Sequence, residues 1–282
     1  MLRTLAILGV LSISTANAQP SPIETRGIRL DGQTVSVETH FGEGLGRVRR
    51  GRQSTELFRG QGIATIVQGH GVGLVAYVTD DEEPFRVRVV RRDEVGEEVT
   101  LARPSGQSHV PFSVVATPLP DGFAVFFQEV QTNDPSAAHT YLARFSAEGV
   151  LREPAREVAI PWGLADAIWN GEGYHLALIY PGNGRGMRLS MVSTTPAGRP
   201  QQHPDWASAA GAITNVHLAR SGERILAFYA NGNQIMERDV TQIGPWGREP
   251  SAGTRRGQLG EHQIIVLRSD GDRVRPTAVR AR

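Results

Sequence analysis

Apolar residues recur along the chain in short segments, and each segment follows a turn glycine. The glycines are Gly73, Gly122, Gly173, Gly222 and Gly271, at steps of 49, 51, 49 and 49 residues. The residues after the first four are strongly β-prone, as in Gly122-Phe-Ala-Val-Phe-Phe. This spacing predicts a repeat protein built from one recurring supersecondary unit.

A second glycine series runs in phase with the first and marks another turn in each unit. Gly96, Gly149, Gly198 and Gly247 lie 23, 27, 25 and 25 residues beyond their partners. We therefore expect about four strands in each unit. In the second unit these strands are expected at residues 112–116, 123–130, 141–146 and 150–159. Their alternation is ragged, which is typical of strands whose two faces are both packed.

Four short strands in each unit predict an all-β fold, a β-propeller of four-stranded blades. The expected propeller domain covers residues 19–282, with blades at residues 62–110, 111–161, 162–211 and 212–257. We expect residues 258–282 and 25–61 to share a composite fifth blade, because a closed ring leaves no strand edge open. A six-bladed ring, in which the N-terminal stretch forms its own blade, and a solenoid are the alternatives.

The N-terminus has the pattern of a cleavable export signal over residues 1–18. Arg3 precedes an apolar run from Leu5 to Ile13, and Ala16-Asn17-Ala18 provides small residues at a cleavage site. The apolar run is too short to span a bilayer, and no later stretch reaches that length. We expect an exported protein, periplasmic or extracellular, without an integral membrane segment. The mature chain is expected to start near Gln19.

Composition removes several classes of function. Cysteine is absent, which excludes thiol catalysis, thiolate zinc sites and disulfides. All 30 basic residues are arginines, and they balance 29 acidic residues to a net charge of +1. Such a balance does not favour nucleic-acid binding, which needs a concentrated basic patch. We expect a monomer that binds no nucleic acid.

Two segments carry a resemblance to known proteins. Arg220-Ser-Gly-Glu-Arg-Ile-Leu-Ala-Phe and Arg144-Phe-Ser-Ala-Glu-Gly are similar to the strand–glycine–strand units of secreted bacterial β-propeller repeat proteins in general. The resemblance covers most of the chain and implies the architecture. It does not imply an activity, because propellers carry lectins, hydrolases and scaffolds alike.

The candidates for chemistry on the expected innermost strands are Asp166 and Asn215, at matching points of consecutive units. A propeller glycosidase needs two carboxylates about 5 to 9.5 Å apart. Asp166 is the one acid among these positions, so it is a candidate catalytic or ligand-binding residue, with Asn215 as a second ligand-binding candidate. The competing interpretation gives Asp166 a structural role, bonded to backbone in a strand or turn.

Two acidic segments are candidate calcium sites. Asp80 and Asp81 belong to the run Asp-Asp-Glu-Glu, and Asp270 and Asp272 flank a turn glycine. Carboxylate oxygens are the ligands that calcium prefers. Solvated turns explain both segments equally well.

The remaining residues of interest form no motif. The eight histidines lack the spacing of a helical zinc site, and no nucleophile elbow or phosphate loop is present. The tryptophans lie near the expected blade ends, where they either stack on sugars or fill space between blades; these are Trp162, Trp169, Trp206 and Trp246.

These observations leave two functional hypotheses. The first is a non-enzymatic propeller scaffold that binds a protein or glycan through loops on one face. The second is a propeller hydrolase, of glycosidase or lactonase type, with a site at the central channel near Asp166 and Asn215 and with calcium as its one candidate cofactor. Several carboxylates converging at one channel mouth would favour the hydrolase.

Overall fold

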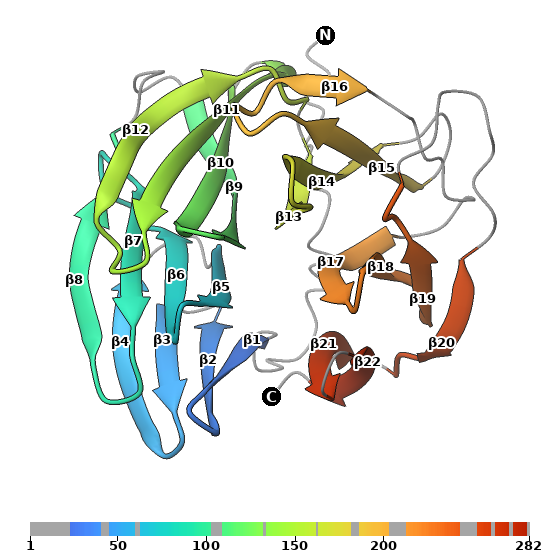
Figure 1. Ribbon diagram of the computed structural model, residues 1–282, viewed down its shortest axis with the longest axis horizontal. Coiled ribbons are helices and arrows are strands. Elements are labelled where there is room, and N and C mark those ends of the chain that lie inside the picture. The colour runs from blue at the N-terminus through green and yellow to red at the C-terminus, as the bar shows by residue number, and fades with distance from the viewer. Residues whose placement is uncertain are drawn as a thin grey trace, which may run out of the picture.

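The structure is a computed structural model, and every regular element in its described residues is a β-strand. The described residues are 23–40, 45–59, 63–102, 109–131, 134–161, 163–181, 186–202, 213–242, 253–260, 263–270 and 273–280. Their strands form five four-stranded antiparallel sheets and one two-stranded sheet. The four-stranded sheets are the blades of a five-bladed β-propeller, arranged around a central axis (Figure 1). The predicted all-β propeller with four-stranded blades is confirmed.

Each blade is a meander of consecutive strands. The first contains β1 (Ile23–Leu30), β2 (Gln33–His40), β3 (Leu45–Arg50) and β4 (Gln53–Arg59). The second contains β5 (Ala64–Gly69), β6 (Val72–Val78), β7 (Phe85–Val90) and β8 (Val95–Thr100). The third contains β9 (His109–Leu119), β10 (Gly122–Gln131), β11 (Asp134–Ser146) and β12 (Leu151–Val158).

The second half of the ring follows the same plan until its last sheet. The fourth blade contains β13 (Leu164–Trp169), β14 (Tyr174–Pro181), β15 (Met187–Thr194) and β16 (Pro200–Gln202). The fifth contains β17 (Ile213–Ser221), β18 (Arg224–Asn231), β19 (Gln234–Asp239) and β20 (Thr254–Gln258). The two-stranded sheet contains β21 (Gln263–Asp270) and β22 (Arg273–Arg280).

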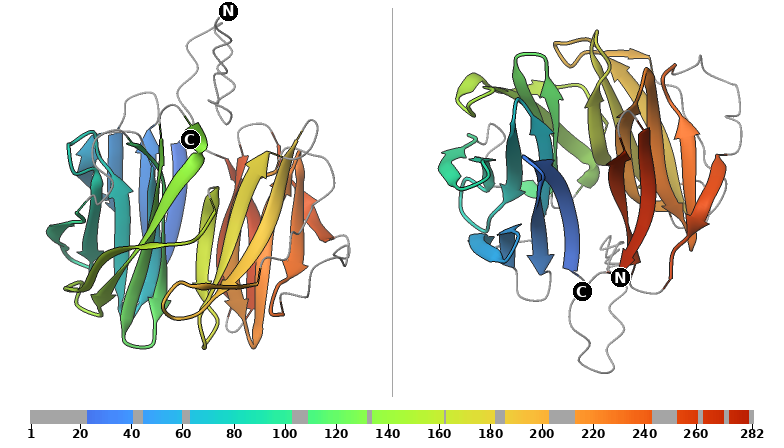
Figure 2. Two further views of the ribbon diagram at one scale, coloured as in Figure 1. Left: turned by 90° about the horizontal axis from the view of Figure 1, so that it is seen from above. Right: turned by 60° about the horizontal axis from the view of Figure 1, so that its bottom comes forward.

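The predicted composite blade is wrong. Residues 23–59 supply all four strands of the first blade, and β21 and β22 pair only with each other among the described strands. The two-stranded sheet lies between the fifth and first blades, where it contacts β17 and β1 (Figures 1 and 2). The N-terminal stretch therefore forms a blade of its own, as the six-bladed alternative supposed, and the sheet that completes the ring has two strands.

The ragged alternation of the strands is explained by packing on both faces. In β10, Phe123, Val125 and Phe127 pack against the second blade, whereas Ala124 and Phe126 pack against the fourth. All five side chains are fully buried. A strand sandwiched in this way needs apolar residues at every position, so it cannot show a simple period of two.

Turn chemistry fixes the hairpins and corrects one expectation. Asp31-Gly32 and His70-Gly71 both have positive φ at two consecutive positions, as two-residue type I′ turns require. Gly149 and Gly198 lie in turns of the third and fourth blades, as predicted. Gly96 does not, because it is the second residue of β8.

Neighbouring sheets share no backbone ladder among the described strands, but hydrogen bonds that involve side chains on or beside their inner strands join them. The sequence separations are 39, 49, 52, 52 and 53 residues, mostly close to one repeat. The bonds run from Arg29 N to Gln68 Oε1 (3.3 Å), His70 Nε2 to the Leu119 carbonyl (2.8 Å), Trp169 N to Thr117 Oγ1 (3.1 Å), Leu218 N to Asp166 Oδ2 (2.7 Å) and Val274 N to Ser221 Oγ (3.3 Å). We call these five contacts the inter-blade bonds.

A buried amide adds to this linkage between the third and fourth blades. Gln128 is fully buried, and its side-chain oxygen accepts from Gly163 N and Leu164 N at 2.8 and 3.1 Å. Its nitrogen donates to Thr140 Oγ1 and to the Pro161 carbonyl. Every polar atom of the side chain is thus satisfied, as a buried amide requires.

The apolar layers between blades are uneven. Those around the first four blades and between the fourth and fifth are large, whereas the layer between the fifth blade and the two-stranded sheet contains only Ala230, Ile235, Leu259 and Ile265 as buried members among the described residues. No helix in the described part of the chain is long and apolar enough to cross a membrane. The predicted signal segment, residues 1–18, lies outside the described residues.

Candidate functional site

The two ends of the ring differ in their connections. At one end the first two strands of each blade are joined by short turns, as at Asp31-Gly32 and Gly222-Glu223. At the other end lie the connections between blades, including the eight residues between β8 and β9 and the ten between β16 and β17. We call this second end the loop-bearing face. Each innermost strand begins at the loop-bearing face, because the connection from the preceding blade leads directly into it.

Asp166 lies on β13, near the loop-bearing face. Its Oδ1 accepts a hydrogen bond from Ala167 N at 2.8 Å, and its Oδ2 accepts the inter-blade bond from Leu218 N at 2.7 Å. Both carboxylate oxygens are therefore held by backbone N–H groups, one of them on the next blade. This geometry gives the carboxylate a role in joining blades.

Asn215 lies on β17, the innermost strand of the adjacent blade. It has a positive φ of 52° and stands in a β-bulge between Thr214 and His217. Its side-chain nitrogen donates to Thr214 Oγ1 at 3.5 Å. The structure thus places Asp166 and Asn215 on neighbouring strands, since Leu218, which bonds to Asp166, is three residues beyond Asn215.

Similar bulges occur near the start of the innermost strands of the third and fourth blades. In β9 the pairing skips Phe112, and in β13 it skips Ala165. Bulges redirect side chains and are frequent beside functional sites. Phe112, at the bulge in β9, has 40% of its surface exposed, and Val110, two residues before it, has 39%.

Phe112 is the functional candidate that the sequence does not reveal. The sequence of its segment predicts an ordinary apolar strand. The exposed ring lies at a bulge, which the apolar pattern does not reveal. Pro111 immediately before it is the one available signal of irregular pairing.

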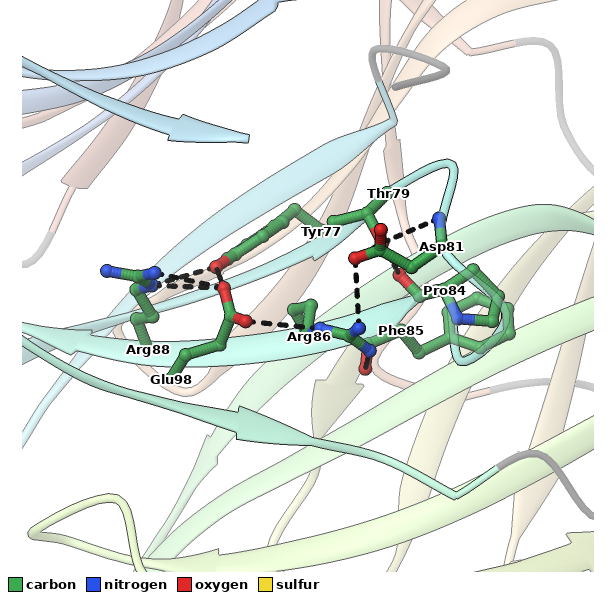
Figure 3. Close-up of polar contacts among 8 residues, drawn as sticks. All are labelled: Tyr77, Thr79, Asp81, Pro84, Phe85, Arg86, Arg88 and Glu98. Atoms are coloured by element: carbon green, nitrogen blue, oxygen red, sulfur yellow. Dashed lines mark hydrogen bonds and ion pairs between the residues drawn. The ribbon is translucent and has the colours of Figure 1, made fainter. Parts of the chain in front are cut away.

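The predicted calcium ligands of the second blade belong to an ion-pair network (Figure 3). Asp81 Oδ2 lies 3.0 Å from an Arg86 guanidinium nitrogen and also accepts from Thr79 Oγ1 at 3.1 Å. Asp80 is exposed in the same turn. Asp81 therefore already has a cationic partner.

Glu98 lies at the centre of this network. Arg86 donates to its Oε1 at 3.2 Å, while Arg88 and the Tyr77 hydroxyl both donate to its Oε2. Burial by itself would raise the pKa of Glu98, but the hydrogen bonds from Tyr77 and Arg88 outweigh it, and the pKa is lowered. Burial and the contact with Glu98 raise the pKa of Tyr77. The network is a stable array of charges that joins strands β6, β7 and β8.

The other two predicted metal ligands, Asp270 and Asp272, belong to the described structure only through the backbone of Asp270. Asp270 is the last residue of β21, and Asp272 lies outside the described residues. Within the described ranges no group of three or more histidine, aspartate or glutamate side chains is placed to hold a metal ion.

One tryptophan is described, and it lies between blades. Trp169 packs with its ring centroid 5.1 Å from that of Tyr174, in the apolar layer between the third and fourth blades. Trp162, Trp206 and Trp246 lie outside the described residues.

Comparison with known proteins shows the fold and no family. No protein-family model matches the chain, and no curated protein matches it. An α-L-arabinofuranosidase from Clostridium thermocellum is 7% identical, with 83% of this chain and 93% of that chain covered and a TM-score of 0.51. At this identity the similarity concerns the fold alone.

Two further solved structures are similar over less of their own length. A xylan β-1,4-xylosidase from Bacillus halodurans is 14% identical, with 77% of this chain covered and a TM-score of 0.48. A puromycin-hydrolysing peptidase from Mycobacterium tuberculosis is 12% identical, with 86% covered and a TM-score of 0.49. This chain spans 48% of the xylosidase and 40% of the peptidase.

Replacing Asp166 tests its structural role. Asp166→Ala leaves Leu218 N and Ala167 N without their acceptor, so we expect a loss of about 2 kcal/mol in the free energy of unfolding. Asp166→Asn keeps one carbonyl acceptor, and we expect it to lose about half as much. Urea denaturation measures both values. Asp121→Ala is the control, because Asp121 is exposed and pairs with Arg152 at 3.4 Å on the surface. An Asp166→Ala protein as stable as this control would contradict the assignment.

The buried histidine of the fourth blade predicts a pH dependence. His175 is 4% exposed, with Nδ1 3.1 Å from Ser193 Oγ, and burial lowers its pKa. The unfolded chain therefore takes up a proton at His175 first as the pH falls, so stability decreases below about pH 6.5. We expect the melting temperature of His175→Gln to fall less steeply than that of the wild type between about pH 7.5 and 5.5. Parallel profiles for the two proteins would show that His175 is not the titrating group.

Proposed function

We propose that this protein is an exported glycan-binding propeller whose binding surface is the loop-bearing face around Phe112. Export is proposed from the signal pattern in residues 1–18, which commits the chain to the periplasm or the medium. Binding through one face is proposed because the connections between blades and the exposed ring of Phe112 belong to the same end of the ring.

The exposed ring of Phe112 is the observation that carries the proposal. An aromatic side chain on a rigid innermost strand offers a flat apolar surface on which the CH face of a sugar can pack. Asn215, near the start of another innermost strand, offers an amide for the sugar hydroxyls. The fold similarity to an arabinofuranosidase supports a glycan, in preference to a protein, as the ligand.

Binding is favoured over hydrolysis by the chemistry of the described acids. A glycosidase needs a proton donor with a raised pKa and a second carboxylate. Asp166 has both oxygens held by backbone N–H groups. Two other described carboxylates, Glu98 and Glu148, have lowered pKa values, which is opposite to what a proton donor needs.

Hydrolysis remains the second candidate function, and the fold similarity to the arabinofuranosidase favours it. In that case a glycosidic bond would be cleaved at the loop-bearing face, with acids other than Asp166 as proton donor and nucleophile or base. Release of reducing ends from arabinan or xylan by the wild-type protein would establish it.

Replacing Phe112 tests the proposed binding surface. Calorimetric titration with neutral oligosaccharides, beginning with arabino- and xylo-oligosaccharides, should identify a ligand for the wild type. Phe112→Ala should weaken that ligand about tenfold, which corresponds to 1.4 kcal/mol. Val150→Ala is the control, because Val150 is 63% exposed but lies at the opposite end of the ring. No binding of any neutral oligosaccharide, or equal affinities for wild type and Phe112→Ala, would contradict the proposal.

A further inference from the structure

A cleft of about 470 Å³ lies between the fifth blade and the two-stranded sheet. Its lining combines three arginines and a glutamate with a serine and three apolar residues: Arg224, Arg256, Arg275, Glu237, Ser221, Leu226, Val274 and Pro276. Ser221 ends β17 and Arg224 begins β18, so the cleft lies toward the short-turn end of the ring. It is separate from the surface around Phe112.

The cleft lies beside the one described sheet that has two strands in place of four. In the fourth blade, the turn between the third and fourth strands contacts the outer strands of the preceding blade. Arg144 and Arg156 of the third blade, for example, donate to the carbonyls of Pro196 and Ala197 in that turn of the fourth, at 2.6 and 2.7 Å. Among the described strands, the two-stranded sheet offers no such turn to the fifth blade, and the cleft lies between the two.

The charges of the cleft do not cancel. Glu237 is paired with Arg256 through two hydrogen bonds of 2.7 and 2.8 Å, and its side chain is only 12% exposed. Arg224 and Arg275 are exposed, and neither forms an ion pair with another described residue. The lining therefore has two positive charges in excess.

The edge of β22 is poorly suited to an added peptide strand. Val274 N already donates to Ser221 Oγ at 3.3 Å, and Pro276 has no N–H. Alternate residues of an antiparallel strand direct their backbone groups to the same edge, so residues 274 and 276 share the outer edge of β22. A peptide strand would find no free donor at either position, which favours a compact ligand.

We propose that this cleft binds the carboxylate of an acidic sugar, a uronate. The guanidinium groups of Arg224 and Arg275 match the planar carboxylate. Leu226, Val274 and Pro276 provide apolar surface for the sugar ring, and the volume is in the range of small-molecule sites. Recognition of the carboxylate follows from the arginines alone, while the choice of a sugar body rests on the proposed glycan function.

Calorimetric titration at low salt tests the site, with galacturonate, trigalacturonate, galactose and inorganic phosphate as probes. We expect galacturonate to bind with a Kd of about 1 mM or lower and galactose not to bind. Arg224→Ala and Arg275→Ala should each weaken galacturonate about tenfold, since each removes a charged hydrogen-bonding group. Arg255→Ala is the matched control, because Arg255 is an exposed arginine next to Arg256 that does not line the cleft.

The probes also separate the sources of the ligand. Equal affinities for galacturonate and trigalacturonate would indicate that the site binds a free or terminal uronate. Tighter binding of trigalacturonate would indicate that the natural ligand is an acidic polysaccharide. Binding of galactose or phosphate as tight as that of galacturonate, or unchanged affinity in both arginine variants, would overturn the proposal. A neutral oligosaccharide that binds the loop-bearing face should not compete with galacturonate. The two proposed sites are therefore tested separately, and one proposal can be wrong while the other holds.

Discussion

The structure depends on the way each innermost strand is joined to the next. The described strands of different blades share no backbone ladder, so the relative positions of the blades are fixed by the apolar layers and by side-chain hydrogen bonds, among them the five inter-blade bonds. Four of these bonds join positions 49 to 53 residues apart, close to one repeat, so each links related points of consecutive units. An apolar layer has no direction, whereas a hydrogen bond fixes register. The bonds therefore determine how the blades align.

This constraint explains the position of the single acid that sequence reasoning selected. A carboxylate on an innermost strand is what a channel-based hydrolase would use, and it is also a strong acceptor for an N–H on the next blade. Asp166 acts as such an acceptor, because Leu218 N donates a hydrogen bond to one carboxylate oxygen and Ala167 N donates to the other. In the proposed function, ligand contacts fall to residues at the bulges of the innermost strands, of which Phe112 is the most exposed described example.

The same constraint explains the cleft. The two-stranded sheet is joined to the fifth blade by the bond from Val274 to Ser221 and by the smallest apolar layer. Two strands are enough to continue the ring at its inner side. The cleft lies between the two sheets, with one excess arginine on each side of it, Arg224 on β18 and Arg275 on β22.

Much of the fold could be predicted from the sequence because its signals are local. The glycine series at Gly73, Gly122, Gly173 and Gly222 predicts the blades, and strands such as β10 and β12 fall close to the predicted ranges. The closure could not be predicted, since Asp31-Gly32 and Gly51 make residues 23–59 a complete blade while the C-terminal strands pair only with each other.

The candidate sites were harder to predict because they depend on distant partners. The role of Asp166 depends on a backbone N–H that lies 52 residues away. The exposure of Phe112 depends on a bulge in the pairing of β9 with β10, and the cleft depends on strands that the last sheet lacks. None of these relations leaves a pattern in neighbouring residues.

Native-state hydrogen exchange at the Leu218 amide tests the central claim most directly. If the inter-blade bonds join the ring into one cooperative unit, this amide exchanges only when the whole domain unfolds. Its opening free energy should then match that of Ala227, in the middle of β18, within about 1 kcal/mol. Exchange of Leu218 through a low-energy local opening, while Ala227 stays protected, would show that the blades separate independently and would contradict the account.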